Sequence, residues 1–251
     1  MKLISLNAWG CRITESFLAF VTENVDSTDI FCFQEILKGG QGRTGTFDEL
    51  KSAFEDISGL LQNHTGYFLE YGKDGYYDEP LENRDFDFGI ASFVRSSLKH
   101  SRGDGCILRD SRKTWSDYSG RLASGVALAV LIDEYVVVNI HGLWQGSIKE
   151  DTEAKIEQSK QILDFAQKFE GKKIICGDFN LLPHTKSIQM LRDEYQDLIQ
   201  DYGIVDTRGS LYTKTLRHSD YAFVDKDIKV DNFSVPKLDI SDHLPLVIEF
   251  E

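Results

Sequence analysis

The segment IICGDFN, residues 174–180, is the most informative stretch of this chain. It begins as a short apolar run of the kind that forms a buried strand, and it ends in a polar turn that contains Asp178 and Asn180. Because these two residues are two positions apart, an extended backbone would point both side chains to the same side. We therefore predict that a strand ends at this segment and presents a carboxylate and an amide beside each other.

The same pattern occurs at three other places in the sequence. The runs ISLN (residues 4–7) and FCFQE (residues 31–35) each end in polar side chains, and SDHLPL (residues 241–246) places polar side chains beside an apolar, strand-like run. We expect the polar groups of all these strand ends to share one site for a hard cation and a phosphate group. These groups belong to Asn7, Glu35, Asp178, Asn180, Asp242 and His243.

Strand-like and helical segments follow one another in an order that predicts an α/β (α+β) fold. The strand-like segments are rich in Ile, Val, Phe and Tyr, and the helical ones repeat apolar residues at steps of three and four. We expect a four-layered α/β/β/α sandwich with two mixed β-sheets, folded as a single domain over residues 1–251. The expected strands are 2–7, 29–34, 66–71, 88–94, 125–132, 135–140, 173–177, 220–225 and 245–250. The expected helices are 12–26, 151–169 and 185–200, and 72–87 is expected to be a surface loop.

The composition is that of an ordinary globular protein, with 41% hydrophobic and 27% charged residues in a chain of 251. No apolar stretch is long enough to span a membrane, and the apolar residues at the N-terminus are too few for the core of a signal peptide. The four cysteines show no CxxC spacing and are expected to be reduced. These features predict a cytoplasmic protein without a transmembrane segment.

The distribution of charge bears on the class of substrate. The net charge of −13 argues against a high-affinity binder of duplex nucleic acid, although it does not exclude a nuclease. Two segments oppose this balance, because residues 95–113 carry a net charge of +4 and residues 207–218 a net charge of +3. These segments are either solvated loops or a basic rim around a phosphate site, and the sequence leaves both possibilities open.

In their order along the chain, the motifs resemble those of the endonuclease/exonuclease/phosphatase superfamily. This superfamily includes pancreatic deoxyribonuclease, apurinic endonucleases, inositol-polyphosphate 5-phosphatases and neutral sphingomyelinases. The resemblance runs from residue 3 to residue 250 and implies a two-layered β-sandwich flanked by helices, with the site at one end. The residues that carry it are Asn7, Gln34 with Glu35, His141, Asp178 with Asn180, Asp220 with Tyr221, and Asp242 with His243.

The resemblance also implies roles for two histidines. His243 would contact the phosphate and would be held by Asp220, since a carboxylate partner fixes the tautomer of an imidazole. His141 would lie near the leaving group and would have a carboxylate partner of its own. The candidates for that partner are Glu70, Asp85 and Asp87.

The candidate residues suit the hydrolysis of phosphate esters, which needs charge neutralisation on the phosphoryl oxygens and an aligned water molecule. Mg²⁺, for which Mn²⁺ could substitute, prefers oxygen ligands. We predict that Asn7, Glu35 and Asp242 hold it, and the lack of a His-rich or Cys-rich motif disfavours zinc. Asp178 would orient or deprotonate the water, and Asn180 would donate its amide to a phosphate oxygen.

The sequence therefore predicts a Mg²⁺-dependent phosphohydrolase, foremost a phosphodiesterase with nuclease-like activity. Its partner would be a phosphate-ester substrate, with nucleic acid as one possibility, and no obligate protein partner is expected. The alternatives are a small-molecule or lipid-headgroup phosphodiesterase, a phosphomonoesterase, and an inactive binding scaffold. Trp9 and Trp144 are either core residues, the interpretation we favour, or a stacking surface for the substrate.

Overall fold

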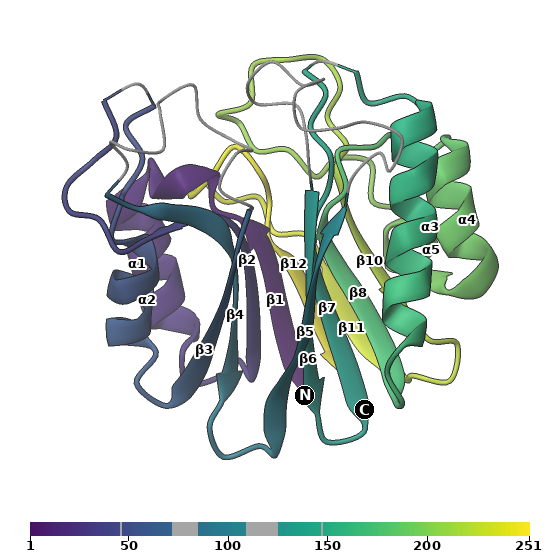
Figure 1. Cartoon of the computed structure of the whole chain (residues 1–251), viewed down its shortest axis with the longest axis horizontal. Helices are drawn as coiled ribbons and strands as arrows, with labels where there is room; N and C mark the ends of the chain where they lie inside the picture. Colours follow the sequence, from purple (N-terminus) through teal and green to yellow (C-terminus); the bar gives the residue numbers. More distant parts are fainter. Residues whose placement is uncertain (46, 72–84, 109–124, 147) are drawn as a thin grey trace.

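The computed structural model describes residues 1–45, 47–71, 85–108, 125–146 and 148–251. Two six-stranded β-sheets face each other, and helices cover the outer face of each (Figure 1). This arrangement confirms the predicted four-layered α/β/β/α sandwich. Among the described residues, no helix is long and apolar enough to cross a membrane.

The first sheet has the strand order β11-β12-β1-β2-β4-β3. Its outer face packs on α1 (Thr14–Asn24) and α2 (Ala53–Leu60) through a cluster of buried apolar side chains that includes several phenylalanines. A short 3₁₀ turn, η1 (Trp9–Cys11), follows the first strand. The strands are β1 (Lys2–Asn7), β2 (Ile30–Lys38), β3 (His64–Glu70), β4 (Asp87–Arg95), β11 (Val230–Ser234) and β12 (Leu246–Phe250).

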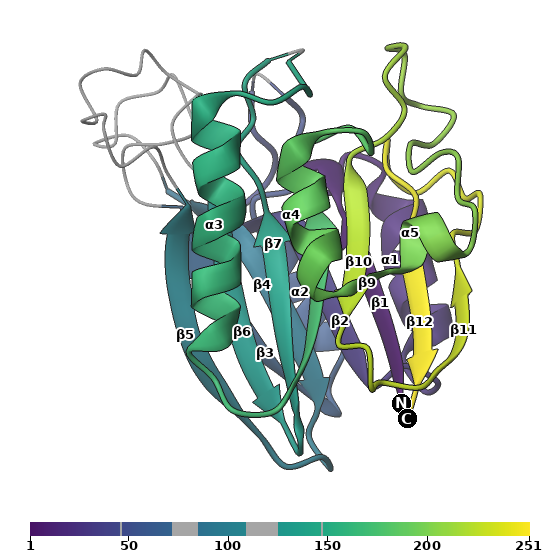
Figure 2. The ribbon, with the colours of Figure 1, turned by 90° about the vertical axis from the view of Figure 1, so that its right-hand side faces the viewer.

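The second sheet has the order β5-β6-β7-β8-β10-β9, and three helices lie on its outer side (Figure 2). These helices are α3 (Glu153–Gln167), α4 (Lys186–Glu194) and α5 (Leu198–Asp201). The strands are β5 (His100–Leu108), β6 (Gly125–Ile132), β7 (Tyr135–His141), β8 (Lys172–Asp178), β9 (Gln196–Asp197) and β10 (Asp220–Val224).

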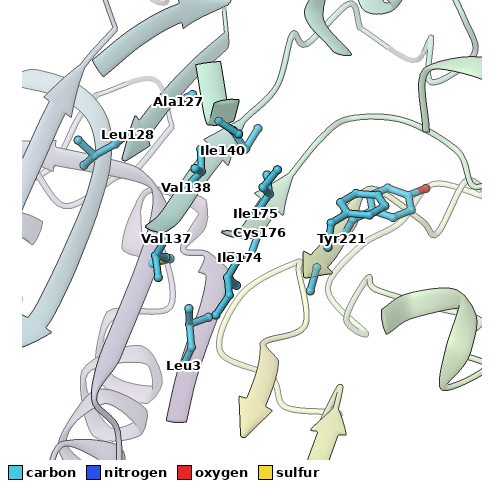
Figure 3. Close-up of a cluster of buried hydrophobic side chains, with 14 of the residues drawn as sticks. Leu3, Ala127, Leu128, Val137, Val138, Ile140, Ile174, Ile175, Cys176 and Tyr221 are labelled. Atoms are coloured by element: carbon cyan, nitrogen blue, oxygen red, sulfur yellow. The ribbon is translucent and has the colours of Figure 1, made fainter. Parts of the chain in front are cut away.

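The main core fills the space between the sheets and continues to the helices on the second sheet. Figure 3 shows part of it, with apolar side chains from β1, β6, β7, β8 and β10. All seven residues of β7 are buried, because both faces of the second sheet are covered. A continuous apolar strand such as IIC before Gly177 is the sequence pattern that such a doubly covered sheet requires.

The strand register brings the predicted polar residues to one end of the sandwich. β1 and β2 are parallel, with Asn7 opposite Gln34, so Glu35 follows directly beside Asn7. β7 and β8 are also parallel, with His141 opposite Asp178. The antiparallel strand β10 places Asp220 on the other side of Asp178. Thus the ends of three neighbouring strands in the second sheet form one row of ionisable groups.

Gly177 allows β7 and β8 to lie close together just before this row. Its φ is +137°, and a Cβ atom there would lie 2.0 Å from the carbonyl oxygen of Ile140. We expect Gly177→Ala to lower the free energy of unfolding by at least about 3 kcal/mol, because the clash involves the backbone of a central strand.

Denaturant unfolding would measure the effect of Gly177→Ala. Gly59→Ala in α2 is the matched control, since nothing lies within 4 Å of a Cβ atom at Gly59. The control should be as stable as wild type or more stable by up to about 1 kcal/mol. Equal stability of both variants would show that the backbone at Gly177 can relax without cost.

The structure corrects two of the three predicted helices. The helix expected over 185–200 is interrupted, because α4 ends at Glu194 and a new helix begins after Asp197. The Asp197 side chain accepts hydrogen bonds from the backbone N–H groups of Ile199 and Gln200, which is how an N-cap residue starts a helix. The helix expected over 12–26 begins only at Thr14, after η1, where the backbone φ values are positive. The third helix, expected over 151–169, forms as α3, and the side chain of Thr152 caps its N-terminus.

Five elements were not predicted, namely η1, α2, β5, β9 and β11. In β5 the glycines Gly103 and Gly105 and a shift of register between Arg102 and Gly105 hide the alternation that marks a strand. Most of the loop expected over 72–87 lies outside the described residues, and its last residue, Asp87, belongs to β4 instead.

Candidate active site

The two sheets are joined at the site by Asn7, which is fully buried. Its Nδ2 atom donates to Oε1 of Glu35 at 3.0 Å and to Oδ2 of Asp178 at 3.1 Å. Its Oδ1 atom accepts a hydrogen bond from the backbone N–H of Trp9, and its backbone carbonyl accepts one from the Ser241 hydroxyl. Asn7 therefore fixes the carboxylates of β2 and β8 relative to each other.

Glu35 lies where the pairing of β2 with β4 is irregular, between Phe33 and Ile36. Its φ is +54°, in the left-handed region, which costs a residue with a side chain about 1–3 kcal/mol. Burial raises the pKa of Glu35 to about 7, against the opposing effects of the Asn7 hydrogen bond and of His243. The strain and the desolvation both indicate that the fold holds this carboxylate in place for a purpose other than stability.

Asp178 is the centre of the cluster. Besides the bond from Asn7, its Oδ1 atom accepts a hydrogen bond from the backbone N–H of Asn180 at 2.9 Å. Burial raises the pKa of Asp178, but the nearby His243, Arg208 and His141 outweigh this effect and hold the pKa below its usual range. Asp178 is therefore ionised at neutral pH although it is buried.

Asn180 and Asp178 both line the same cavity, as the sequence predicted, but the reason differs. The φ of Asn180 is +55°, so the segment is not extended there and simple alternation does not apply. The Asn180 side chain donates to the backbone carbonyl of Gly142 at 3.3 Å, and the backbone carbonyl of Asn180 accepts a hydrogen bond from Nζ of Lys155 at 2.8 Å. These bonds hold the turn after β8 in its shape.

His243 and Asp220 form a pair, as the family resemblance implied. Nδ1 of His243 donates to Oδ1 of Asp220 at 2.8 Å, which directs Nε2 toward Asp178 at 3.6 Å and Asp242 at 3.7 Å. Burial and Arg208 lower the pKa of His243, but these three carboxylates outweigh them and the pKa is raised. The imidazolium form of His243 is thus stabilised within the site.

His141 lies in the same cluster, and among the described residues it has no separate carboxylate of the kind that the resemblance implied. Its Nε2 atom is 3.7 Å from Glu35 and 3.8 Å from Asp178, and burial lowers its pKa to about 4. Among the described residues, Nδ1 of His141 has no hydrogen-bond partner. The carboxylates proposed as its partner lie elsewhere: Glu70 and Asp87 are exposed, and Asp85 is paired with Lys51.

Arg208 belongs to the site, although the sequence suggested only that it lies on a basic rim. It is buried, and it donates to Asp242 at 3.0 Å and to the Ser219 hydroxyl at 2.9 Å. Its guanidinium lies 4.5 Å from the centre of the Tyr212 ring. The only sequence signal for this position is that Arg208 lies in a basic segment without acids, which cannot distinguish a buried cation from a surface one.

The site opens into a cavity of about 340 Å³. Glu35, Asp178, Asn180, Asp242 and His243 line it, whereas Asn7, His141 and Asp220 lie buried behind them. Trp9 and Trp144 also line the cavity and are only partly buried, so our favoured interpretation of them as core residues was wrong. The rest of the wall is formed by Arg12, Phe47, Glu49, Gly146, Lys149, Arg208, Tyr212, Lys214, Thr215 and Leu216.

The donor groups of the site fit a hard divalent cation. Oδ1 of Asp242 is buried and has no hydrogen-bond partner among the described residues, and Glu35 carries a desolvated carboxylate on the same cavity wall. Both offer the oxygen ligands that Mg²⁺ prefers. The amide oxygen of Asn7 already accepts the Trp9 N–H, so Asn7 fits better as a group that orients Glu35. Asp178, Asp220 and His243 also lie close enough together to bind a metal ion, with ligand atoms within 4.8 Å of one another. They suit a cation less well, because Asp220 and His243 already form a hydrogen bond with each other.

The chain belongs to the Endonuclease/Exonuclease/phosphatase family, whose sequence profile matches residues 4–243. Members of this family are typically metal-dependent hydrolases of phosphate esters. No curated protein sequence matches the chain.

Solved structures share the fold over the whole chain. An endonuclease/exonuclease/phosphatase from Bacteroides vulgatus is 15% identical with a TM-score of 0.69, covering 100% of this chain and 98% of its own. A mannosyl-6-phosphatase from Bacteroides thetaiotaomicron is 15% identical with a TM-score of 0.69, covering 100% and 99%. The human nocturnin catalytic domain with bound sulfate is 18% identical with a TM-score of 0.62, covering 100% and 93%. At these identities the likeness shows the fold and not the substrate.

Proposed function

We propose that this chain is a divalent-cation-dependent hydrolase of small phosphate esters. The observation that carries the proposal is the meeting of ionisable groups from both sheets at the wall of one 340 Å³ cavity. A cavity of this volume suits a small molecule, and its polar groups are few and fixed by hydrogen bonds. The same fold is found in a mannosyl-6-phosphatase and in nocturnin, so the side chains of the cavity must decide the substrate.

Glu35 and Asp242 would hold the cation, which we propose is Mg²⁺, with Mn²⁺ able to replace it. When bound, it would neutralise charge on the phosphoryl oxygens and favour deprotonation of water. Asn7 would keep Glu35 in place through its 3.0 Å hydrogen bond. The backbone strain at Glu35 would serve the same end, because a carboxylate fixed in advance needs no reorganisation when the cation binds.

The remaining groups would act on the attacking water and on the phosphoryl group of the substrate. Asp178 is ionised and would accept a hydrogen bond from the attacking water and orient it toward phosphorus. Asn180 would donate its amide to a phosphoryl oxygen. His243, kept cationic by Asp220, would donate from Nε2 to the phosphoryl group, and His141 would lie near the leaving group.

A nuclease is only the second candidate. The basic side chains of residues 207–218 favoured it, but two of the three are buried or ion-paired within the protein and are not free to bind a polyanion. Arg208 is buried, and Arg217 is ion-paired with Asp206 at 2.7 Å and also donates to backbone carbonyls. Lys214 lines the cavity and is the residue of this segment that could contact an extended substrate. In the other basic segment, residues 95–113, Arg95 is ion-paired with Asp29 at 2.9 Å, and Arg109, Arg112 and Lys113 lie outside the described part of the chain.

Salt dependence distinguishes the two candidates. We expect kcat/KM for a small aryl phosphate to change by no more than a few fold between 50 and 200 mM salt, since the substrate offers one phosphate. An enzyme that holds an oligonucleotide through many phosphates would lose about 10³–10⁵ in affinity over that range. Steep salt dependence together with faster cleavage of an oligonucleotide would favour the nuclease.

A substrate panel with Mg²⁺ tests the proposal directly. It would contain an aryl phosphomonoester, an aryl phosphodiester, inositol phosphates, sphingomyelin, RNA, and single-stranded and duplex DNA. Turnover of a small ester that disappears on chelation supports the proposal. No turnover of any member with Mg²⁺ or Mn²⁺ would favour the inactive scaffold. We also infer that residues 1–251 act as one domain, since side chains from both sheets form the site. The cysteines of the described residues are unpaired, and this supports our proposal that the protein is cytoplasmic.

A further inference from the structure

Lys149 is a buried ammonium group at the wall of the cavity. Its exposed fraction is 6%, and its Nζ atom donates to the backbone carbonyl of His218 at 3.0 Å. Within the described part of the chain, no carboxylate lies within 4.0 Å of it. Burying an ammonium without a paired charge is unfavourable by several kcal/mol. The substrate-free protein therefore keeps this cation at a cost in the free energy of folding. Such a cost is expected of a group that binds an anion when the substrate is present.

The surroundings of Lys149 show where that anion would lie. Lys149 lines the same cavity as Asp178, Asn180 and Arg208, and its Nζ atom is 5.5 Å from the centre of the Tyr212 ring. An ammonium group has three N–H donors, of which the His218 carbonyl takes one. Arg208 is already matched by Asp242 at 3.0 Å. Among the described residues, Lys149 is thus a buried cation of this cavity whose charge is not matched by a direct ion pair.

A second buried lysine provides the contrast. Lys155 is fully buried, and burial lowers the pKa of Lys155 and of Lys149 alike to about 8. However, Nζ of Lys155 donates to two backbone carbonyls, those of Ile148 and Asn180, and Lys155 does not line the cavity. Lys155 therefore ties two loops together, whereas Lys149 makes one such bond and faces the space where substrate would enter.

We propose that Lys149, beside Arg208 and Tyr212, recognises the second negative charge of a phosphate dianion, and that the enzyme thereby prefers phosphomonoesters to phosphodiesters. The inference rests on the proposed function and names its substrate class. A phosphomonoester carries close to two negative charges and three non-bridging oxygens at neutral pH, because its second pKa is about 6. A phosphodiester carries one charge and two such oxygens. An additional fixed cation therefore gains most from the monoester.

The test compares two substrates with the same leaving group, 4-nitrophenyl phosphate and methyl 4-nitrophenyl phosphate, on the full chain with Mg²⁺. We expect wild type to prefer the monoester. Lys149→Met should lower kcat/KM for the monoester by about 10–100-fold, as the loss of one charge-assisted hydrogen bond implies. The diester should lose less than about 3-fold by the same reasoning. Lys149→Arg should restore most of the monoester activity, and inorganic phosphate should inhibit Lys149→Met more weakly than wild type.

Thermal unfolding separates recognition from a structural role. Lys149→Met should melt at the temperature of wild type or above it, because it removes a buried charge that has no ion-pair partner. Lys155→Met, the matched control, should melt at least about 4 °C lower because two buried carbonyls lose their donor. A similar fall for Lys149→Met would show that its ammonium supports the fold and would overturn the inference.

The kinetic outcomes also distinguish the inference from the proposed function. Equal losses on both substrates, or no loss on either, would overturn the preference for dianions while leaving a working hydrolase. Wild type that hydrolyses neither ester with Mg²⁺ or Mn²⁺ would instead overturn the proposed function.

Discussion

Asp178→Asn will lower turnover of a small phosphate ester by about 10²–10⁴-fold, the range for a positioned acid–base group. The carboxylate accepts a hydrogen bond from the Asn7 amide at 3.1 Å and one from the backbone N–H of Asn180. An asparagine at this position has one acceptor oxygen. If that oxygen keeps the bond from Asn180, the new amide NH₂ group faces the NH₂ group of Asn7, and the hydrogen bond between the two sheets is lost.

The lost charge matters as much as the lost acceptor. Arg208, His141 and His243 all hold the pKa of Asp178 below its usual range, so a neutral residue there removes the anion that Arg208 and the His243 imidazolium share. The attacking water would then lose the ionised acceptor that we propose orients it.

The control for Asp178→Asn is the same substitution at Asp225. Asp225 follows β10 at the opposite end of the second sheet and accepts a hydrogen bond from the backbone N–H of Lys173 at 2.6 Å. Asp225→Asn keeps an acceptor oxygen for that bond and should retain turnover within about 3-fold. Steady-state kinetics at saturating Mg²⁺, with thermal unfolding of each variant, would measure both effects. Wild-type turnover in Asp178→Asn would remove Asp178 from the role of water acceptor.

The fold could be predicted from the sequence where patterning is strong. The run before Gly177 is continuously apolar because both faces of the second sheet are covered, and this pattern does not depend on distant contacts. By contrast, β5 was missed because glycines and an irregular register interrupt its alternation. The break after Glu194 was missed because a helical periodicity continues across it, and the cap at Asp197 that starts the next helix depends on the backbone turn itself.

The sequence predicted most of the residues that form the site, but it did not predict which of them contact one another. The strand-end residues were found because parallel strands bring such positions to one end of a sheet. Arg208 and Lys149 were not assigned to the site, since a buried lysine and an exposed one look alike in a sequence without burial information. The contact of Asn7 with Asp178 joins the two sheets over 171 positions of sequence, and no local pattern encodes it.

The second large effect concerns the cation. Treatment with a chelator should abolish turnover, and Mg²⁺ or Mn²⁺ should restore it, because the oxygen groups of Glu35 and Asp242 are the ones that such ions prefer. Glu35→Gln should raise the Mg²⁺ concentration for half-maximal activity by at least about 10-fold, since even groups outside the first layer of ligands typically change metal affinity by 10–100-fold. The backbone at Glu35 should keep its strained conformation, because glutamine has nearly the same size.

Glu49→Gln is the matched control for the cation. Glu49 lines the same cavity, but its carboxylate is ion-paired with Arg12 at 3.1 Å, and we expect the Mg²⁺ requirement of this variant to stay within about 3-fold of wild type. A second measurement does not depend on turnover. Mg²⁺ should raise the melting temperature of wild type and of Glu49→Gln, and should raise it less for Glu35→Gln, because a ligand that binds the folded state more tightly stabilises it more. Equal stabilisation of all three proteins would place the cation away from Glu35. Full activity after rigorous removal of metal would end the proposal that hydrolysis depends on a cation.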